Sequence, residues 1–121
     1  MFIEHVNLTV SDLDRSIAFY SDLLDMHVRW KGPIDADRLG AHVGDDRCYL
    51  ALFQATHDGV VDHDYLRLGV NHFGFVVDDL DEARRRVERL GAKVHLEADY
   101  EPGRRIYVFD PDGYEVELVA Y

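Results

Sequence analysis

The sequence has few cysteines, few positive charges and no long apolar run, and each shortage excludes a class of protein. Among 121 residues only Cys48 is a cysteine, so no disulfide framework can form within the chain. No apolar run approaches the roughly 18 residues that span a bilayer as a helix. Asp and Glu outnumber Lys and Arg by 24 to 13, which gives a formal net charge of −11. Because an acidic surface repels phosphate backbones and anionic lipid, we expect neither nucleic-acid nor membrane partners.

The start and the length of the chain are typical of a small globular protein. Residues 1–5 lack the basic region and the apolar stretch of a signal peptide. Together with the single cysteine, this predicts a reducing, cytoplasmic setting. A chain of 121 residues with 47% hydrophobic and 31% charged residues has the size and composition of one globular domain. We therefore predict a single domain over residues 1–121.

An internal repeat organises this domain. Residues 4–14 align with residues 71–81 at an offset of 67 positions. The identical pairs are His5/His72, Val10/Val77, Asp12/Asp79, Leu13/Leu80 and Asp14/Asp81. Both copies alternate like a strand and then lead into the acidic start of a helix. The same local structure is therefore predicted twice.

Each copy of the repeat continues with the same series of elements. Apolar residues at helical spacing follow both strands, with Asp79 and Glu82 as a capping box and Gly91 as the end of the second helix. Three strand-like segments follow each helix, at about 27–31, 38–43 and 48–53 and at about 94–98, 104–109 and 115–120. The prediction is an α+β fold of two βαβββ modules. They are expected at about 1–54 and 70–121, with a linker at about 55–69.

Two histidines and one glutamate are the candidate metal ligands. Strand alternation places His5 on the more polar face of the first strand, and the repeat gives His72 the same orientation. Glu117 lies between apolar neighbours near the middle of the last strand, an awkward position for a carboxylate that binds nothing. Two imidazoles and a carboxylate suit one divalent ion of Fe, Mn, Zn, Ni or Co and leave coordination positions free.

Ordinary roles for these histidines stay open. A single histidine at the start of a strand is more often a half-exposed residue with an ordinary hydrogen bond than a metal ligand. His5 and His72 differ from the others because they form the repeat-equivalent pair. The remaining histidines have no such equivalent and are interpreted as surface or loop residues: His27, His42, His57, His63 and His95.

Three motifs make the sequence similar to a known superfamily. They are HVNLTVSDLDRSIAFYSDLL at residues 5–24, NHFGFVVDDL at residues 71–80 and DPDGYEVEL at residues 110–118. Together they resemble the vicinal oxygen chelate superfamily, which includes glyoxalase I, bleomycin-resistance proteins, extradiol dioxygenases, methylmalonyl-CoA epimerase and fosfomycin-resistance enzymes. The resemblance implies two βαβββ modules that form a curved mixed sheet around a cleft. It also implies a homodimer, because small members of the family commonly build the cleft across two chains.

The resemblance implies a role for the predicted ligands as well. In such proteins a divalent metal chelates neighbouring oxygens of a small substrate, and the corresponding positions here are His5, His72 and Glu117. We thus predict a metal-dependent enzyme in which the ion acts as Lewis acid and template. The reaction is left open among isomerase, lyase, dioxygenase and epoxide or thiol-addition chemistry. The alternative is a protein of the same fold that sequesters a small, antibiotic-like molecule without chemistry.

The sequence departs from individual subfamilies at specific positions. Glyoxalase I and epimerase types have a fourth ligand, Glu or Gln, where this chain has Ala51. Fosfomycin-modifying members resemble the chain at Tyr107 but have Thr where it has Asn7. Bleomycin-binding members lack the ligands that this chain retains. The resemblance therefore predicts a three-ligand site without a specific reaction, and the catalytic base is not assigned, although Glu115 is an uncoordinated carboxylate near Glu117.

Side chains on the expected cleft face indicate the character of the substrate. The candidates for substrate contact are Asn7, Tyr49, Phe53, Arg105 and Tyr107. Aromatic rings around one arginine favour a small, partly apolar and anionic substrate. Tyr49 and Phe53 can equally fill the concavity of the sheet or a dimer interface. The DPDG segment at residues 110–113 is interpreted as a turn that sets the register of Glu117.

Overall fold

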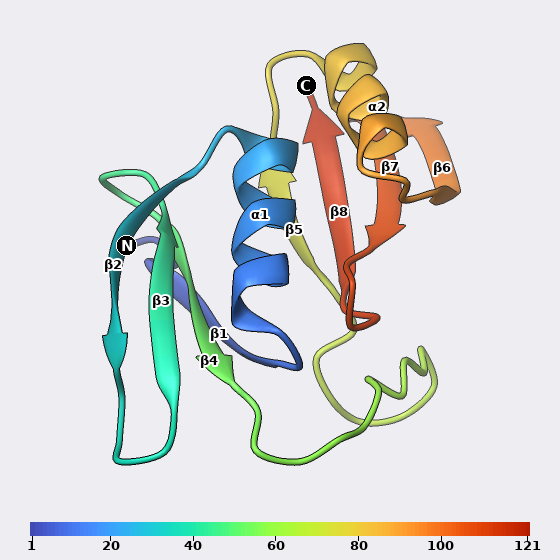
Figure 1. Ribbon diagram of the computed structural model, residues 1–121. Coiled ribbons are helices and arrows are strands. Elements are labelled where there is room, and N and C mark those ends of the chain that lie inside the picture. The colour runs from blue at the N-terminus through green and yellow to red at the C-terminus, as the bar shows by residue number, and fades with distance from the viewer. The chain divides into compact units, whose positions relative to one another are not determined.

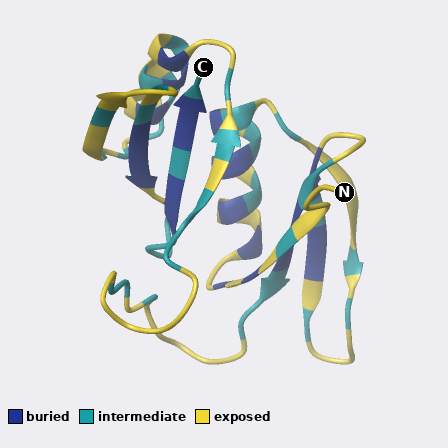
Figure 2. Ribbon diagram, turned by 180° about the vertical axis from the view of Figure 1, so that it is seen from behind, coloured by how far each residue is buried: buried dark blue, intermediate teal, exposed yellow.

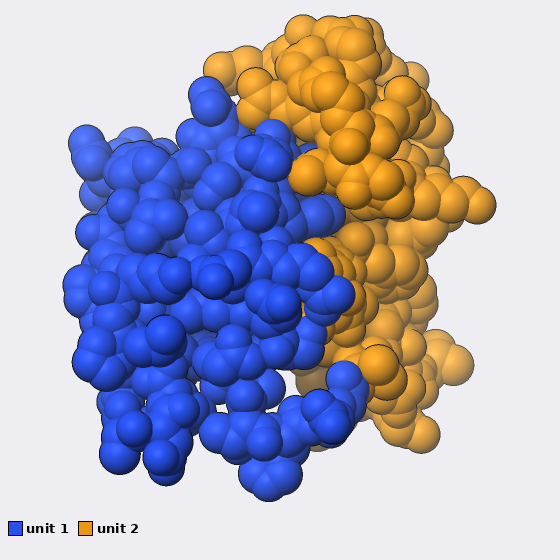
Figure 3. Space-filling model, viewed as in Figure 1, with its two compact units in different colours: residues 1–59 blue, residues 60–121 orange.

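The protein is described by a computed structural model that covers all 121 residues. Neither of its helices has the length and apolar character needed to cross a membrane. The chain divides into two compact units, Met1–Gly59 and Val60–Tyr121, which Figure 3 distinguishes by colour. Each unit contains one helix and four strands.

The first unit is a four-stranded mixed sheet with one helix (Figure 1). Its elements are β1 (His5–Val10), α1 (Leu13–Leu24), β2 (His27–Pro33), β3 (Leu39–Gly44) and β4 (Tyr49–Gln54). The strand order is β1-β4-β3-β2. Strands β1 and β4 run parallel, and the other neighbours run antiparallel.

The second unit repeats this topology. Its elements are β5 (Phe73–Val76), α2 (Leu80–Arg89), β6 (Val94–Tyr100), β7 (Gly103–Phe109) and β8 (Glu115–Ala120). The strand order is β5-β8-β7-β6, with β5 and β8 parallel. The predicted α+β fold of two βαβββ modules is confirmed, and the three strands after each helix lie close to their predicted positions.

The core of the first unit lies between α1 and the sheet. Helix α1 packs on β3 and β4, and its buried face consists of Leu13, Ser16, Phe19, Tyr20 and Leu23. The facing strand residues include Val43, Leu50 and Leu52, each at most 1% exposed. Burial of a leucine side chain contributes about 1.5–3 kcal/mol. Leu8 and Val10 are also buried, so β1 directs its apolar row inward as its alternation predicts.

In the second unit, α2 covers one face of β7 and β8. The helix contributes Leu80, Ala83 and Val87, and the strands contribute Ile106, Val108, Val116 and Leu118. Figure 2 shows β8 as mostly buried and β5 as more exposed. Because successive strand residues point to opposite faces, the other face of β7 and β8 presents Arg105, Tyr107, Glu115 and Glu117. That face holds the predicted ligand Glu117.

Equivalent aspartates begin the two helices. The side chain of Asp12 accepts a hydrogen bond from the backbone N–H of Arg15, and that of Asp79 accepts one from Glu82. The predicted capping box is only half correct, because the Glu82 carboxylate binds arginines of its own helix instead of the Asp79 backbone. Gly91 follows α2 with a positive φ of 71°, as expected for a helix end.

The DPDG turn and the sheet register place Glu117. Asp110 Oδ1 accepts hydrogen bonds from the backbone N–H groups of Asp112 and Tyr114, and Gly113 has a φ of 94°. Beyond this turn Glu117 pairs with Gly74 of β5. In the first unit Ala51 pairs with Asn7 of β1, which lies two residues after His5 just as Gly74 lies two residues after His72. Ala51 and Glu117 therefore occupy equivalent positions in the two modules.

Candidate metal and substrate site

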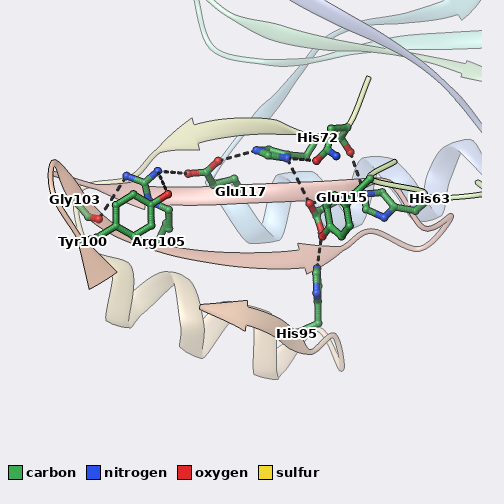
Figure 4. A network of polar contacts seen from close by, with 10 residues as sticks. His63, His72, His95, Tyr100, Gly103, Arg105, Glu115 and Glu117 are labelled. Atoms are coloured by element: carbon green, nitrogen blue, oxygen red, sulfur yellow. Dashed lines mark hydrogen bonds and ion pairs between the residues drawn. The ribbon is translucent and has the colours of Figure 1, made fainter. Parts of the chain in front are cut away.

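His72 directly precedes β5, and its ring lies between two carboxylates of β8 (Figure 4). Nε2 is 3.0 Å from Oε2 of Glu117. Nδ1 is 2.6 Å from Oδ1 of Asn71 and 3.5 Å from Oε1 of Glu115. Both ring nitrogens therefore face oxygen acceptors. A neutral imidazole carries one N–H and can satisfy only one of these two sides, so a cation at Nε2 would satisfy the other.

The other carboxylate oxygen of Glu117, Oε1, forms an ion pair with Arg105. Nη1 of Arg105 lies 3.3 Å from Oε1 of Glu117, and both side chains are 13% exposed. The guanidinium also lies over the ring of Tyr100, 4.6 Å from its centre. Figure 4 shows the resulting chain from Tyr100 through Arg105 and Glu117 to His72. Because Arg105 engages Oε1, Oε2 is the oxygen that faces His72.

The spacing of His72 and Glu117 fits two ligands of one metal ion. At metal–donor distances of about 2.0–2.2 Å, neighbouring ligand atoms of one ion lie about 3 Å apart. Nε2 of His72 and Oε2 of Glu117 are 3.0 Å apart. No group of three histidine, cysteine, aspartate or glutamate side chains is arranged so that it could hold a metal ion. The second unit thus brings together two of the predicted ligands, and the third belongs to the first unit.

His5 begins β1 and has its own carboxylate partner. Its Nδ1 lies 3.0 Å from Oε2 of Glu4, and its side chain is 46% exposed. The ring stacks on Tyr49, which is the residue opposite it on β4, at a centre-to-centre distance of 5.1 Å. An acceptor at Nδ1 leaves Nε2 as the nitrogen available to a metal.

The predicted substrate contacts on the first unit form part of an aromatic surface. Tyr49 lies between the rings of His5 and His42, and Trp30 continues the row beyond His42. Burial lowers the pKa of His42, with a further contribution from the nearby Arg29. This surface suits a planar or apolar ligand group.

Two further predicted contacts on the first unit have local partners. The Asn7 amide donates a hydrogen bond of 2.9 Å to the backbone oxygen of Ala51. Phe53 is partly buried and lies close to Gly40 of the neighbouring strand. The Asn7 side chain is thus engaged between β1 and β4.

Tyr107 lies beside the predicted ligands on the second unit. Its ring meets His72 edge-to-face at 5.4 Å and is 9% exposed. Burial raises the pKa of Tyr107, and the nearby Glu117 charge adds to this effect. The hydroxyl therefore keeps its proton and can act as a hydrogen-bond donor.

Glu115 has partners that the sequence did not reveal. Its side chain is fully buried, and its Oε2 accepts a hydrogen bond from the Tyr65 hydroxyl and lies 2.9 Å from Nε2 of His95. Tyr65 itself is 52% exposed, but its hydroxyl is turned toward this carboxylate. Burial of the hydroxyl and the bond to Glu115 raise the pKa of Tyr65 to about 12, so the hydroxyl remains a donor.

His63 lies in the loop segment before β5 and His95 is a surface residue of β6, as predicted, but both side chains also lie near Glu115. The His95 ring stacks on Phe109 at 4.1 Å, and its side chain is only 23% exposed. Nε2 of His63 lies 3.1 Å from the backbone oxygen of Asn71 and 3.8 Å from Oε1 of Glu115. One signal in the sequence was available, because Glu115 shares the face of Glu117 by alternation and a buried carboxylate needs polar partners.

With this geometry established, comparison with known proteins defines the family. The Glyoxalase/Bleomycin resistance protein/Dioxygenase superfamily matches residues 2–118. The chain belongs to this superfamily, as its three motifs led us to expect.

The most similar curated relatives include lactoylglutathione lyases. A probable lactoylglutathione lyase of Synechocystis is 32% identical over 124 residues, which cover 98% of this chain and 95% of the relative. A probable chloroplastic lactoylglutathione lyase of Arabidopsis thaliana is 33% identical over 123 residues. The match covers 95% of this chain but only 34% of the length of the Arabidopsis protein.

Solved structures support the fold. A glyoxylase/bleomycin resistance protein/dioxygenase domain from Frankia sp. superimposes with a TM-score of 0.84 at 25% identity, covering 99% of this chain and 97% of that one. The fosfomycin resistance protein FosX of Listeria monocytogenes superimposes with a TM-score of 0.79 at 21% identity, covering 98% of this chain and 90% of that one. That FosX variant was solved in complex with Mn(II) and 1S,2S-dihydroxypropylphosphonic acid.

Proposed function

We propose that this protein is a divalent-metal-dependent enzyme acting on a small substrate that chelates the metal through neighbouring oxygens. The proposed ligands are His5, His72 and Glu117. The metal is one ion of Fe, Mn, Zn, Ni or Co. The observation that carries the proposal is the 3.0 Å separation between Nε2 of His72 and Oε2 of Glu117, on a sheet face away from the helix.

The residues around this pair have complementary tasks. Arg105 holds the second oxygen of Glu117 and balances its charge. Tyr107 packs against the His72 ring and offers a protonated hydroxyl to a substrate oxygen. A divalent ion at the site supplies Lewis-acid stabilisation of negative charge that develops on substrate oxygens. We propose Asn7, Tyr49 and Phe53 as substrate contacts from the first unit.

The names of the relatives suggest which reaction to assay first. Lactoylglutathione lyases that match nearly the whole chain are about one-third identical to it. Lyase activity is therefore the first candidate within the proposed class. Ala51 stands where a fourth carboxylate or amide ligand would lie, so three protein ligands leave more positions for substrate than four do.

We also propose that the protein works as a homodimer. The segment from Val60 to Val70, which precedes β5, carries apolar side chains that are largely or fully exposed. They are Val60 at 88%, Leu66 at 96%, Leu68 at 107% and Val70 at 87%. Exposed apolar surface of this kind is typical of an interface with another chain. A second copy of the chain would remove these side chains from water.

The metal content of the purified protein tests the proposed function. Wild type, Glu117→Gln and the control Glu97→Gln are purified without added metal or chelator and then reconstituted with each of the five ions. Glu97 is an apt control because it lies in the same unit with its side chain 56% exposed and is paired with Arg84. We expect about one ion per wild-type chain, an unchanged control, and a strong loss in Glu117→Gln.

The opposite result favours the alternative function. If wild type stays metal-free after reconstitution with all five ions, the enzyme proposal falls and a sequestering protein takes its place. Small-molecule binding would then be unaffected by His72→Ala. If metal binds equally well to Glu117→Gln, the proposed ligand set is wrong.

A further inference from the structure

Glu115 is a buried carboxylate with one oxygen that lacks a hydrogen-bond partner. Its side chain is 0% exposed. Oε2 receives the Tyr65 hydroxyl and lies close to His95, whereas Oε1 is buried and unbonded. A buried carboxylate without donors on one oxygen is costly, and each such group in a folded protein calls for an explanation.

Two imidazole nitrogens lie nearest to the unbonded oxygen. Nδ1 of His72 is 3.5 Å from Oε1 of Glu115, and Nε2 of His63 is 3.8 Å away. Both nitrogens also lie close to Asn71. Nδ1 of His72 is 2.6 Å from its side-chain oxygen, and Nε2 of His63 is 3.1 Å from its backbone oxygen. Figure 4 shows Glu115 between His72 and His95. The carboxylate thus lies on the Nδ1 side of His72, opposite the side that faces Glu117.

A hydrogen-bond acceptor at Nδ1 of a histidine determines whether Nε2 carries a proton or a lone pair. When Nδ1 keeps its proton to donate, Nε2 presents a lone pair, and that nitrogen is the one that binds a metal. The amide oxygen of Asn71 is the nearer acceptor at Nδ1, at 2.6 Å, and a carboxyl oxygen of Glu115 lies behind it at 3.5 Å. Because the Glu115 side chain is shielded from water, its carboxyl group acts on the ring with little screening by solvent.

We propose that Glu115 is a positioning residue that acts through His72. Its carboxylate keeps the proton on Nδ1 and makes Nε2 a better donor of electron density toward the site shared with Glu117. This inference rests on the proposed function, in which His72 is a metal ligand. It adds a residue that the three-ligand pattern does not contain. Tyr65 and His95 both contact Oε2 of Glu115 and so orient its carboxyl group.

The two modules differ at this point. The residue opposite His5 on β4 is Tyr49, and the continuation of the β5–β8 register places Glu115 opposite His72. His5 therefore stacks on an aromatic ring, whereas His72 lies against a carboxylate. The charge behind the second histidine is a specific property of the second module, and a substitution at Glu115 tests it without altering His5.

The experiment measures binding of Ni²⁺ alone by calorimetry to the full chain. Glu115→Gln keeps the shape of the side chain and removes its charge, and Glu97→Gln makes the same chemical change at an exposed site. We expect Ni²⁺ to bind about 10- to 100-fold more weakly to Glu115→Gln. The control should match wild type. Circular dichroism establishes that both variants are folded.

A second measurement reports on His72 without any metal. Ring ¹⁵N chemical shifts of the metal-free protein identify which nitrogen carries the proton. We expect the Nδ1–H form in wild type and a larger share of the Nε2–H form in Glu115→Gln. If Glu115→Gln does not fold, the wild-type spectrum decides, because a proton on Nε2 of His72 would overturn the proposal.

The outcomes separate the positioning role from the proposed function. Unchanged Ni²⁺ affinity and an unchanged His72 tautomer in folded Glu115→Gln overturn the positioning role and leave the metal site standing. A second Ni²⁺ equivalent that is lost in Glu115→Gln also overturns it, because Glu115 would then be a ligand itself. If wild type binds no metal, the proposed function fails, and the tautomer comparison alone decides the role of Glu115.

Discussion

Ala51 and Glu117 are structural equivalents that differ in chemistry. Each lies opposite the strand residue two positions after the repeat-equivalent histidine, Asn7 in the first module and Gly74 in the second. Glu117 presents a carboxylate to His72, whereas Ala51 presents a methyl group that is 5% exposed. The repeat has therefore kept its register while only one module carries a carboxylate at this position.

A carboxylate placed at Ala51 is expected to strengthen metal binding. Alternation puts residue 51 on the same face as Tyr49, against which His5 stacks, so Ala51→Glu adds an acidic group beside a proposed ligand. We expect Ni²⁺ to bind severalfold more tightly by calorimetry. Ala51→Leu adds similar bulk without charge and should not tighten binding. Equal affinities for Ala51→Glu and wild type would contradict the assignment of this position as the missing fourth ligand.

Loss of Arg105 is expected to destabilise the metal-free protein. Arg105→Met removes the cation 3.3 Å from a Glu117 carboxylate that is only 13% exposed. Leaving a largely buried acceptor without its donor costs about 1–3 kcal/mol. Urea unfolding measures the change, and added Ni²⁺ should restore part of it, because a second cation again balances Glu117.

A double-mutant cycle isolates the Arg105–Glu117 interaction. The double variant Arg105→Met/Glu117→Gln no longer contains the unpaired carboxylate. Its loss of unfolding free energy should therefore be smaller than the sum of the losses in the two single variants. Strictly additive losses would mean that the two side chains do not stabilise each other.

The arginines of α2 give the protein an acid-sensitive contribution to stability. Arg85, Arg89 and Arg86 hold the pKa of Glu82 at about 2, below its ordinary value of 4.5. Because the pKa of Glu82 is lowered in the folded state, its contribution to the free energy of unfolding is complete above about pH 4.5. This contribution is lost as the pH falls through about 2. We expect Glu82→Gln to lower the melting temperature at neutral pH.

The pH dependence of that difference is the decisive readout. The gap between the melting temperatures of wild type and Glu82→Gln should shrink as the pH falls from about 4.5 to about 2. Glu88→Gln, an exposed change on the same helix, should show no such trend. A gap that stays constant over this range would exclude the arginine contacts as its source.

The exposed leucines between the modules are expected to control the oligomeric state. Light scattering should give wild type a mass of twice the 14.0 kDa chain. Leu66→Ser/Leu68→Ser should shift the protein toward the single-chain mass, because the substitutions remove apolar surface that a second chain would cover. Leu96→Ser, at a leucine that is 49% exposed on β6, serves as the control. A wild-type protein with the single-chain mass would refute the proposed homodimer.

The amino-acid sequence by itself determined the fold and the identity of the principal candidates. The repeat of His5 and His72, the alternation of the strands and the DPDG turn predict two βαβββ modules. These are local signals, because a period of two or of 3.6 residues records which face of an element is buried. They also singled out Glu117, whose position between apolar neighbours is visible in the sequence.

Only the tertiary structure decided which side chains surround one another. Tyr65, His95 and Glu115 come from separate parts of the chain, and their contacts depend on strand register and on the path of the segment before β5. Arg105, expected to contact substrate, engages Glu117 across the paired strands β7 and β8, a partner that the sequence did not indicate. Alternation gives the face of a residue but not its neighbours across a sheet, because neighbours are set by hydrogen-bonded pairing between segments far apart in the sequence.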